Sequence, residues 1–114
     1  MLVTDPLLLL LNLFNMNLGE TIKIVRKRKG LSQGELALSI GITQAYLSQI
    51  EKNKKNPNLS TLKLLSENLG LPLPVLFFKS IDDSDIPSEK KEAYNLISNT
   101  LEDLVDKIFF SEVQ

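Results

Sequence analysis

The stretch from Ser32 to Asn53, "SQGELALSIGITQAYLSQIEKN", is the most informative part of the sequence for the fold. Two short helical patterns meet at Gly41, because apolar residues recur at spacings of three or four on each side of it. The sequence predicts one helix over 32–40 and a second over 43–52. Glycine suits the tight turn between them, since it adopts a left-handed backbone without strain from a Cβ atom. The inward-facing positions are Leu36, Ala37 and Ile40 in the first helix and Leu47 and Ile50 in the second.

Capping residues mark where both helices start. Ser32 and Glu35 have the spacing of a capping box, and Thr43 is placed to cap the second helix. The joint formed by Gly41, Ile42 and Thr43 has the length of the turn in a helix-turn-helix unit. With Leu47 and Ile50 turned inward, the second helix presents an outward row made of Gln44, Ala45, Ser48, Gln49 and Lys52.

The rest of the chain also has helical spacing, and no convincing strand pattern interrupts it, so we expect an all-α fold. Further helices are predicted over 18–29, 60–69, 72–78 and 87–110. Ser60 is the expected cap of the helix over 60–69, with Leu59 and Leu64 as a hydrophobic staple. The expected division is an apolar N-terminal extension (1–15), a helix-turn-helix domain (16–79), an acidic linker (80–86) and a C-terminal helical segment (87–114).

The amino-acid composition excludes several classes of function. The 114 residues include no Cys and no His, so Cys-based zinc sites, thiol nucleophiles and histidine acid–base catalysis are excluded. Residues 16–80 hold ten Lys and Arg against four Asp and Glu, whereas residues 81–114 hold three against nine. A basic middle and an acidic end favour a nucleic-acid-binding module joined to a segment that does not touch nucleic acid. We expect no enzyme activity, no metal and no cofactor.

The apolar run over residues 6–14, "PLLLLLNLF", is well short of the roughly 20 residues that span a bilayer. It lacks the basic flank and the small-residue cleavage site of a signal peptide. We therefore expect a cytoplasmic protein that is associated with the nucleoid and does not contact a membrane.

The central stretch resembles the phage-repressor/Cro-like helix-turn-helix family, also called the xenobiotic-response-element family of regulators. The resemblance rests on Ser-Gln at 32–33, Glu-Leu-Ala at 35–37, the turn glycine, Ile-Glu at 50–51 and Asn-Pro at 56–57 followed by spaced leucines. It covers about residues 18–78. It implies a five-helix lambda-repressor-like domain, here with an extra C-terminal helix and a short apolar N-terminal segment.

The resemblance implies that the second helix of the motif enters the major groove of double-stranded DNA. Glutamine amides can bond adenine bidentately, and an alanine methyl can touch a thymine methyl. The expected base-reading residues are Gln44, Ala45, Ser48 and Gln49. The residues expected to contact the DNA backbone are Gln33, Thr43, Tyr46, Lys52, Asn53, Lys54, Lys55 and Asn56. Two positions are possible for Tyr46: its ring can lie at the edge of the core or against a sugar-phosphate of the DNA.

The resemblance also implies a structural role for two charged residues. Arg26 and Glu51 are expected to form a partly buried ion pair between two helices. For the neighbouring Lys27 and Lys29 we expect a solvated face.

The C-terminal segment carries a heptad-like apolar stripe. Such a stripe must be buried, either against its own domain or against a second copy. The favoured alternative is a homodimer, with the leucine run available as additional apolar surface. The expected dimerisation residues are Tyr94, Ile97, Leu101, Leu104, Val105, Ile108 and Phe109.

Together these features favour a dimeric transcriptional repressor that reads a pseudo-palindromic operator. Two alternatives use the same DNA-binding domain: an antitoxin that also binds a toxin protein, and the controller protein of a restriction-modification system.

Overall fold

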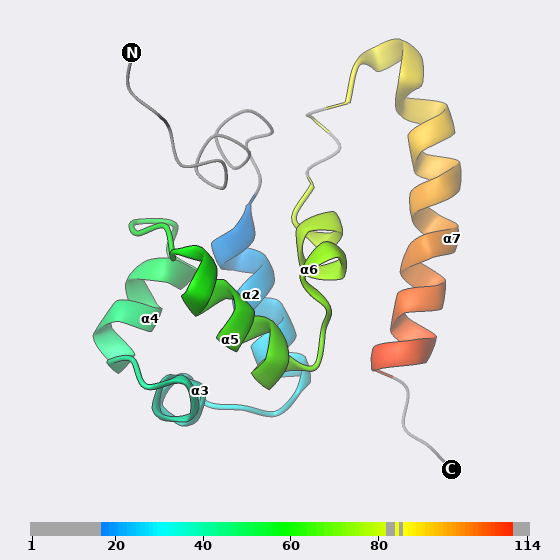
Figure 1. Cartoon of the computed structure of the whole chain (residues 1–114). Coiled ribbons are helices and arrows are strands. Elements are labelled where there is room, and N and C mark those ends of the chain that lie inside the picture. Colours follow the sequence, from blue (N-terminus) through cyan, green and yellow to red (C-terminus); the bar gives the residue numbers. More distant parts are fainter. Residues whose placement is uncertain (1–16, 82–83, 85, 111–114) are drawn as a thin grey trace.

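The computed structural model describes residues 17–81, 84 and 86–110, and these residues form helices and turns without a strand. The helices are α2 (Leu18–Arg28), α3 (Gln33–Ile40), α4 (Gln44–Glu51), α5 (Leu59–Leu69), α6 (Leu73–Lys79) and α7 (Lys91–Phe109), with a short 3-10 turn, η2 (Ser88–Lys90). Helices α2 to α6 gather into one body, and α7 runs alongside α6 (Figure 1). The all-α fold, with five helices and an extra C-terminal one, is confirmed. The leucine run at 6–14 lies outside the described residues.

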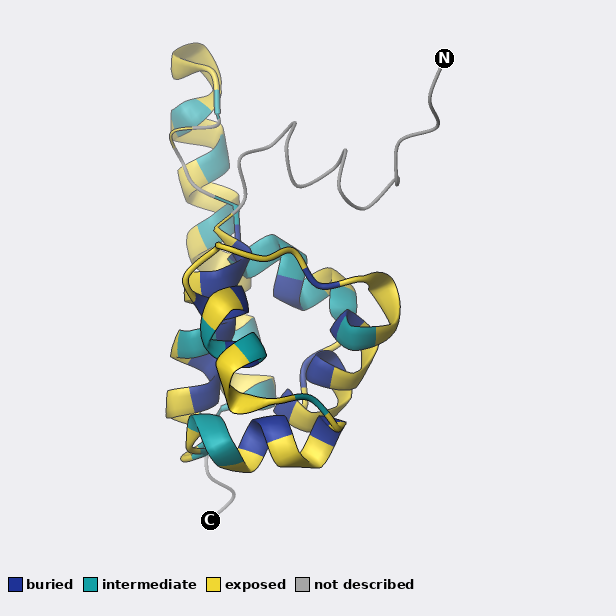
Figure 2. Ribbon diagram, turned by 90° about the vertical axis from the view of Figure 1, so that its left-hand side faces the viewer, coloured by how far each residue is buried: buried dark blue, intermediate teal, exposed yellow. Residues whose placement is uncertain are grey.

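A single hydrophobic core joins α2 to α6. Its side chains come from the inward faces expected of each helix, and the dark residues in Figure 2 line the inside of the body. Burying a Leu or Ile side chain stabilises the fold by about 1.5–3 kcal/mol. Within the described residues, no helix is both long enough and apolar enough to cross a membrane. The core residues are Leu18, Ile22, Val25, Leu36, Ala37, Ile40, Leu47, Ile50, Leu62, Leu65, Leu69, Leu71 and Leu76.

The turn between α3 and α4 has the expected geometry. Gly41 has a left-handed backbone with φ 76°, and its N–H bonds back to the end of α3. Ser32 and Glu35 form both bonds of the capping box, and the Thr43 hydroxyl accepts the Tyr46 N–H at 3.0 Å. Hydrogen bonds from Ser32, first from its backbone and then from its side chain, lower the pKa of Glu35. These caps fix the direction in which α4 leaves the turn.

The start of α5 differs from the prediction. Its cap is Asn58, whose side chain accepts the Thr61 N–H at 2.8 Å, and Ser60 already lies inside the helix. The proposed staple is wrong as well, because with Asn58 as the N-cap Leu59 is the first residue of the helix and does not precede the cap. Asn and Ser are comparable N-caps, so residue type alone did not exclude Ser60.

The first turn of α2 lies directly against the end of α4. The Gly19 N–H donates to Asn53 Oδ1 at 2.9 Å, and Asn53 Nδ2 donates to Asn17 Oδ1 at 2.7 Å. A Cβ atom on Gly19 would overlap the Ile50 carbonyl oxygen, so only glycine permits this approach. Asn53 itself has φ 59°, a left-handed conformation that asparagine tolerates better than most residues. These contacts hold the far end of α4 on α2.

Helix α7 contacts the body through its C-terminal half. Lys79 Nζ lies 2.6 Å from Glu102 Oε2, and Arg28 Nη1 lies 3.1 Å from Asp106 Oδ1. Lys29, for which a solvated position was expected, instead donates to the Phe109 carbonyl at 2.6 Å. The sequence pattern could not reveal this contact, because Lys29 and Phe109 are 80 residues apart.

Candidate nucleic-acid interface

The outward face of α4 carries the polar row expected from the sequence. Gln44, Ala45 and Gln49 are exposed and Ser48 is half-buried, while Leu47 and Ile50 are buried beneath them. A short helix anchored by two fully buried side chains presents the others in fixed directions. Tyr46 is half-buried and packs against the core, which is the first of its two alternatives.

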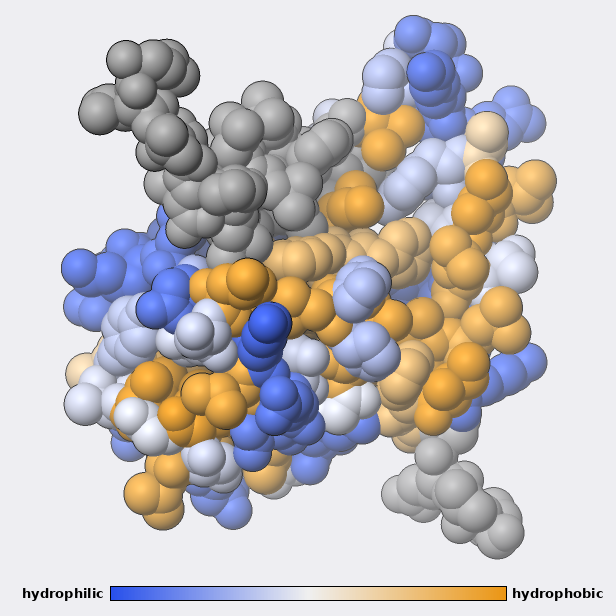
Figure 3. All heavy atoms as spheres, viewed as in Figure 1, coloured by the Kyte–Doolittle hydropathy of each residue, from blue (hydrophilic) through white to orange (hydrophobic). Residues whose placement is uncertain are grey.

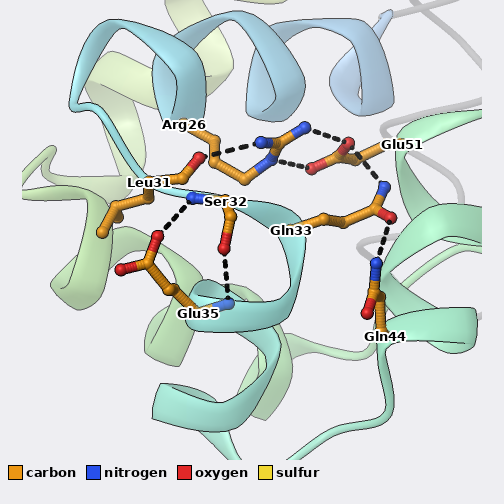
Figure 4. Close-up of polar contacts among 7 residues, drawn as sticks. All are labelled: Arg26, Leu31, Ser32, Gln33, Glu35, Gln44 and Glu51. Carbon is orange, nitrogen blue, oxygen red and sulfur yellow. Dashed lines mark hydrogen bonds and ion pairs between the residues drawn. The ribbon is translucent and has the colours of Figure 1, made fainter.

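A chain of polar contacts runs from the surface of α4 into the interior (Figure 4). Gln44 Nε2 donates to Gln33 Oε1 at 3.4 Å, and Gln33 Nε2 donates to Glu51 Oε1 at 3.1 Å. One N–H and the carbonyl oxygen of the Gln44 amide are left for a ligand, since each amide has two donor hydrogens. Gln33 thus orients the exposed amide at the start of α4.

Arg26 and Glu51 close this chain as a bidentate ion pair between α2 and α4. Arg26 Nε lies 2.7 Å from Glu51 Oε2, and Nη2 lies 3.0 Å from Oε1. The two side chains are only 8% and 2% exposed. Arg26 Nη1 also donates to the Leu31 carbonyl at 2.9 Å, so the guanidinium holds the loop before α3 as well. The pair therefore fixes how α2, α3 and α4 meet.

A polar hollow of about 470 Å³ lies between α2 and α4, next to the amide row. Four of its lining residues were not singled out as site residues from the sequence: Asn17, Glu20, Lys23 and Lys27. Lys23 and Lys27 are four residues apart and so share one face of α2, a signal that the sequence does contain. The remaining lining residues are Arg26, Gln33, Ser48, Glu51, Lys52 and Asn53.

The other expected backbone-contacting residues lie at the two ends of α4. Thr43 is the N-cap, and its hydroxyl is used within the protein. Lys54, Lys55 and Asn56 are exposed in the loop that follows the helix. The Lys54 and Lys55 N–H groups bond to the Gln49 carbonyl at 2.8 and 3.3 Å, which places both lysines close to the last turn of α4.

The residues expected at a dimer contact separate onto two faces of α7. Ile97, Leu101, Leu104 and Ile108 are 59%, 39%, 48% and 68% exposed, and we name these four residues the outer stripe. Tyr94 and Val105 are half-buried, and Phe109 packs against the core of its own domain. Figure 3 shows hydrophobic residues along α7 and over the neighbouring α6.

Helices α3 and α4, the turn at Gly41 and the exposed row of side chains define a helix-turn-helix domain. A helix-turn-helix family model matches residues 22–76. The chain is 33% identical over 97 residues to the transcriptional regulator SinR of Bacillus licheniformis, covering 83% of this chain and 86% of SinR. The chain therefore belongs to the phage-repressor/Cro-like family of helix-turn-helix transcriptional regulators.

Two further similarities show how far the family likeness extends. The chain is 31% identical over 80 residues to the immunity repressor of Bacillus phage phi105, covering 70% of this chain but 53% of the repressor. The chain thus spans about half the length of that relative. A crystal structure of the biofilm regulator SinR in complex with DNA shares 40% identity, with a TM-score of 0.50, over 52% of this chain and 95% of that one.

Proposed function

We propose that the protein is a sequence-specific double-stranded DNA-binding regulator, which acts as a dimeric repressor on a pseudo-palindromic operator. The observation that carries this proposal is the Gln44 amide, exposed at the start of α4 and held by Gln33. An amide so oriented can donate to adenine N7 and accept from its N6 amino group in the major groove. Ala45, Ser48 and Gln49 share the outward face and extend the reading surface along α4.

The first test is a selection of bound sequences from a random DNA pool. We expect Gln44→Ala to relax preference at one base pair of each half-site and to cost about 1–3 kcal/mol per half-site. Folding should be unaffected, because Gln44 is exposed. Gln49→Ala is the matched variant, and it should relax a different base pair. An unchanged sequence preference in both variants would contradict base reading by α4.

We also propose that residues around this surface contact the phosphates of the DNA backbone. Lys23, Lys27 and Lys52 line the hollow beside α4, and Lys54 and Lys55 follow the helix. Such cations position the protein along the DNA backbone and carry little sequence information. Gln33, Asn53 and Asn56 add uncharged donors next to them.

The lysines give a salt-dependence prediction. Lys27→Ala, Lys54→Ala and Lys55→Ala should each weaken binding to all sequences similarly. Each should flatten the slope of log affinity against log salt by about 0.9 for every DNA phosphate that the variant no longer neutralises. Titrations at several salt concentrations measure this slope. Lys63→Ala on α5 is the control, since Lys63 is exposed and lies outside both the hollow and the loop after α4. An equal slope change in the control would mean that only net charge matters.

Dimerisation through α7 is the second part of the proposal. The outer stripe follows the 4, 3, 4 spacing of a coiled-coil seam, and its four side chains are large, aliphatic and exposed. A second copy of the chain presents the same stripe, so two α7 helices can pair about a two-fold axis. The axis would place two α4 helices on successive major grooves, about 34–36 Å apart or a multiple of this.

An antitoxin or a controller protein would use the same reading surface. The antitoxin role adds a different polypeptide on the outer stripe, so the native complex would contain two sequences. The controller role adds activation, which transcription from the selected operator in vitro would reveal. A complex with twice the mass of the chain, one polypeptide sequence and lowered transcription supports the repressor.

A further inference from the structure

In the described part of the chain, one face of α7 contacts the body of the protein and another carries the exposed outer stripe. Glu102, Asp106 and Phe109 point to the body of the protein. At 3.6 residues per turn, this inner face lies about 140° around the helix from the outer stripe. A single helix is therefore fixed to its own domain on one side and exposes a coiled-coil seam on another.

The inner face is held by charged contacts together with the packing of Phe109 and Phe110 on the core. Lys79 Nζ lies 2.6 Å from Glu102 Oε2 and 3.9 Å from Asp106 Oδ1, and the Lys79 side chain is only 11% exposed. The Arg28 guanidinium carbon lies 3.8 Å from the centre of the Phe110 ring, and Lys29 Nζ lies 4.8 Å from it. We name the contacts of Lys79 with Glu102 and Asp106 the α7 clamp.

The clamp is connected to the reading helix by a short series of backbone and side-chain bonds. Lys79 ends α6, and the carbonyl of the next residue, Ser80, accepts the Asn17 N–H at 3.0 Å. Asn17 is bonded to Asn53, which follows the C-terminal end of α4. The position of α7 relative to α4 is thus set by direct contacts through α6 and the start of α2.

We infer that the α7 clamp fixes the half-site spacing that the dimer accepts. This inference rests on the proposed pairing of α7 helices. If each α7 is fixed to its own domain, the paired helices hold the two α4 helices at one separation and one rotation. Changing the operator by one base pair moves a half-site by about 3.4 Å and rotates it by about 34–36°. A fixed dimer cannot follow this movement without breaking contacts, whereas a dimer whose α7 helices are released from their own domains can.

The experiment measures the affinity of the full chain for palindromes whose half-sites are moved apart in steps of one base pair. The wild-type protein should favour one spacing. Lys79→Met keeps the apolar stem of the lysine but removes its charge, and it should reduce the discrimination between the best and the neighbouring spacings by roughly three- to tenfold. Affinity for a single half-site should stay at the wild-type value.

A second variant acts from the other side of the clamp. Glu102→Gln with Asp106→Asn removes the charges without changing side-chain shape, and these residues are exposed enough for the fold to tolerate the change. It should give the same flattened spacing profile. Lys107→Met and Asp103→Asn are the controls, since both change the charge of α7 at exposed positions outside the clamp.

The outcomes separate the inference from the function on which it rests. A wild-type protein that is monomeric, or that binds no DNA selectively, overturns the proposed function and the inference with it. A wild-type dimer with selective binding whose two clamp variants both keep the wild-type spacing profile overturns the inference alone. A control variant that flattens the profile as much as Lys79→Met also overturns it.

Discussion

Replacing Arg26 by Met should destabilise the fold by about 3–5 kcal/mol. The Glu51 carboxylate is 2% exposed and receives two bonds from Arg26, so the variant leaves a buried charge without its partner. The Leu31 carbonyl loses its donor as well. Among the described residues, the Gln33 side chain would then be the remaining hydrogen-bond donor to the carboxylate. Urea denaturation followed by far-UV circular dichroism gives the free energy of unfolding.

Two companion variants show whether the buried charge is the cause. Arg26→Met with Glu51→Met removes both charges and should recover much of the stability, because apolar replacements of a buried pair are often neutral or stabilising. Lys27→Met removes a neighbouring exposed cation and should stay within about 0.5 kcal/mol of the wild type. An Arg26→Met protein with wild-type stability but no DNA binding would instead identify Arg26 as a phosphate contact.

The helices and the core could be predicted because they depend on local patterns. Leu18, Ile22 and Val25 recur at helical spacing and are buried, and Gly41 has the left-handed backbone expected of the turn. The outward direction of Gln44 followed once Leu47 was assigned to the core. These inferences need only the helical period and the backbone preferences of a few residues.

Long-range contacts could not be predicted in the same way. The Arg26–Glu51 pair was expected only from the family resemblance, since nothing in the spacing of two charges 25 residues apart selects that partner. Lys79 and Glu102 belong to different helices, and their pairing depends on where α7 lies against the body. The hollow lined by Lys23 and Lys27 arises from the approach of α2 to α4 at Gly19, which periodicity does not encode.

The stripe on α7 illustrates the same limit. The spacing of its residues predicts an apolar seam. This seam can pack either on its own domain or on a second copy of the chain. In the structure Phe109 packs against its own core while Ile97 and Ile108 remain exposed, so packing on the same domain accounts for only one face of the helix. A sequence pattern cannot separate two faces of a helix when apolar residues of both faces are neighbours in the chain, as Ile108 and Phe109 are.

Changing Leu101 and Leu104 together to Asp should convert the proposed dimer into monomers. Both side chains belong to the outer stripe and are 39% and 48% exposed in the single chain, so the substitution does not disturb a buried position. In a paired seam it would place four carboxylates together, and their desolvation and mutual repulsion oppose association. Affinity for the full operator should fall by about 10²–10⁴-fold, because binding one half-site would no longer hold the protein at the second.

Sedimentation at micromolar concentration measures the association, and a single half-site supplies the reference affinity. Leu96→Asp with Asn99→Asp is the matched control, since it adds the same charge to α7 at exposed positions outside the stripe. This control should remain dimeric and keep the affinity of the wild type for the operator. The stripe is only about two heptads long, and a pair of such helices is marginal alone, so a modest reduction in apolar burial is enough to dissociate it. If the stripe variant stays dimeric, or the wild-type chain sediments as a monomer, the outer face of α7 is not the contact between copies.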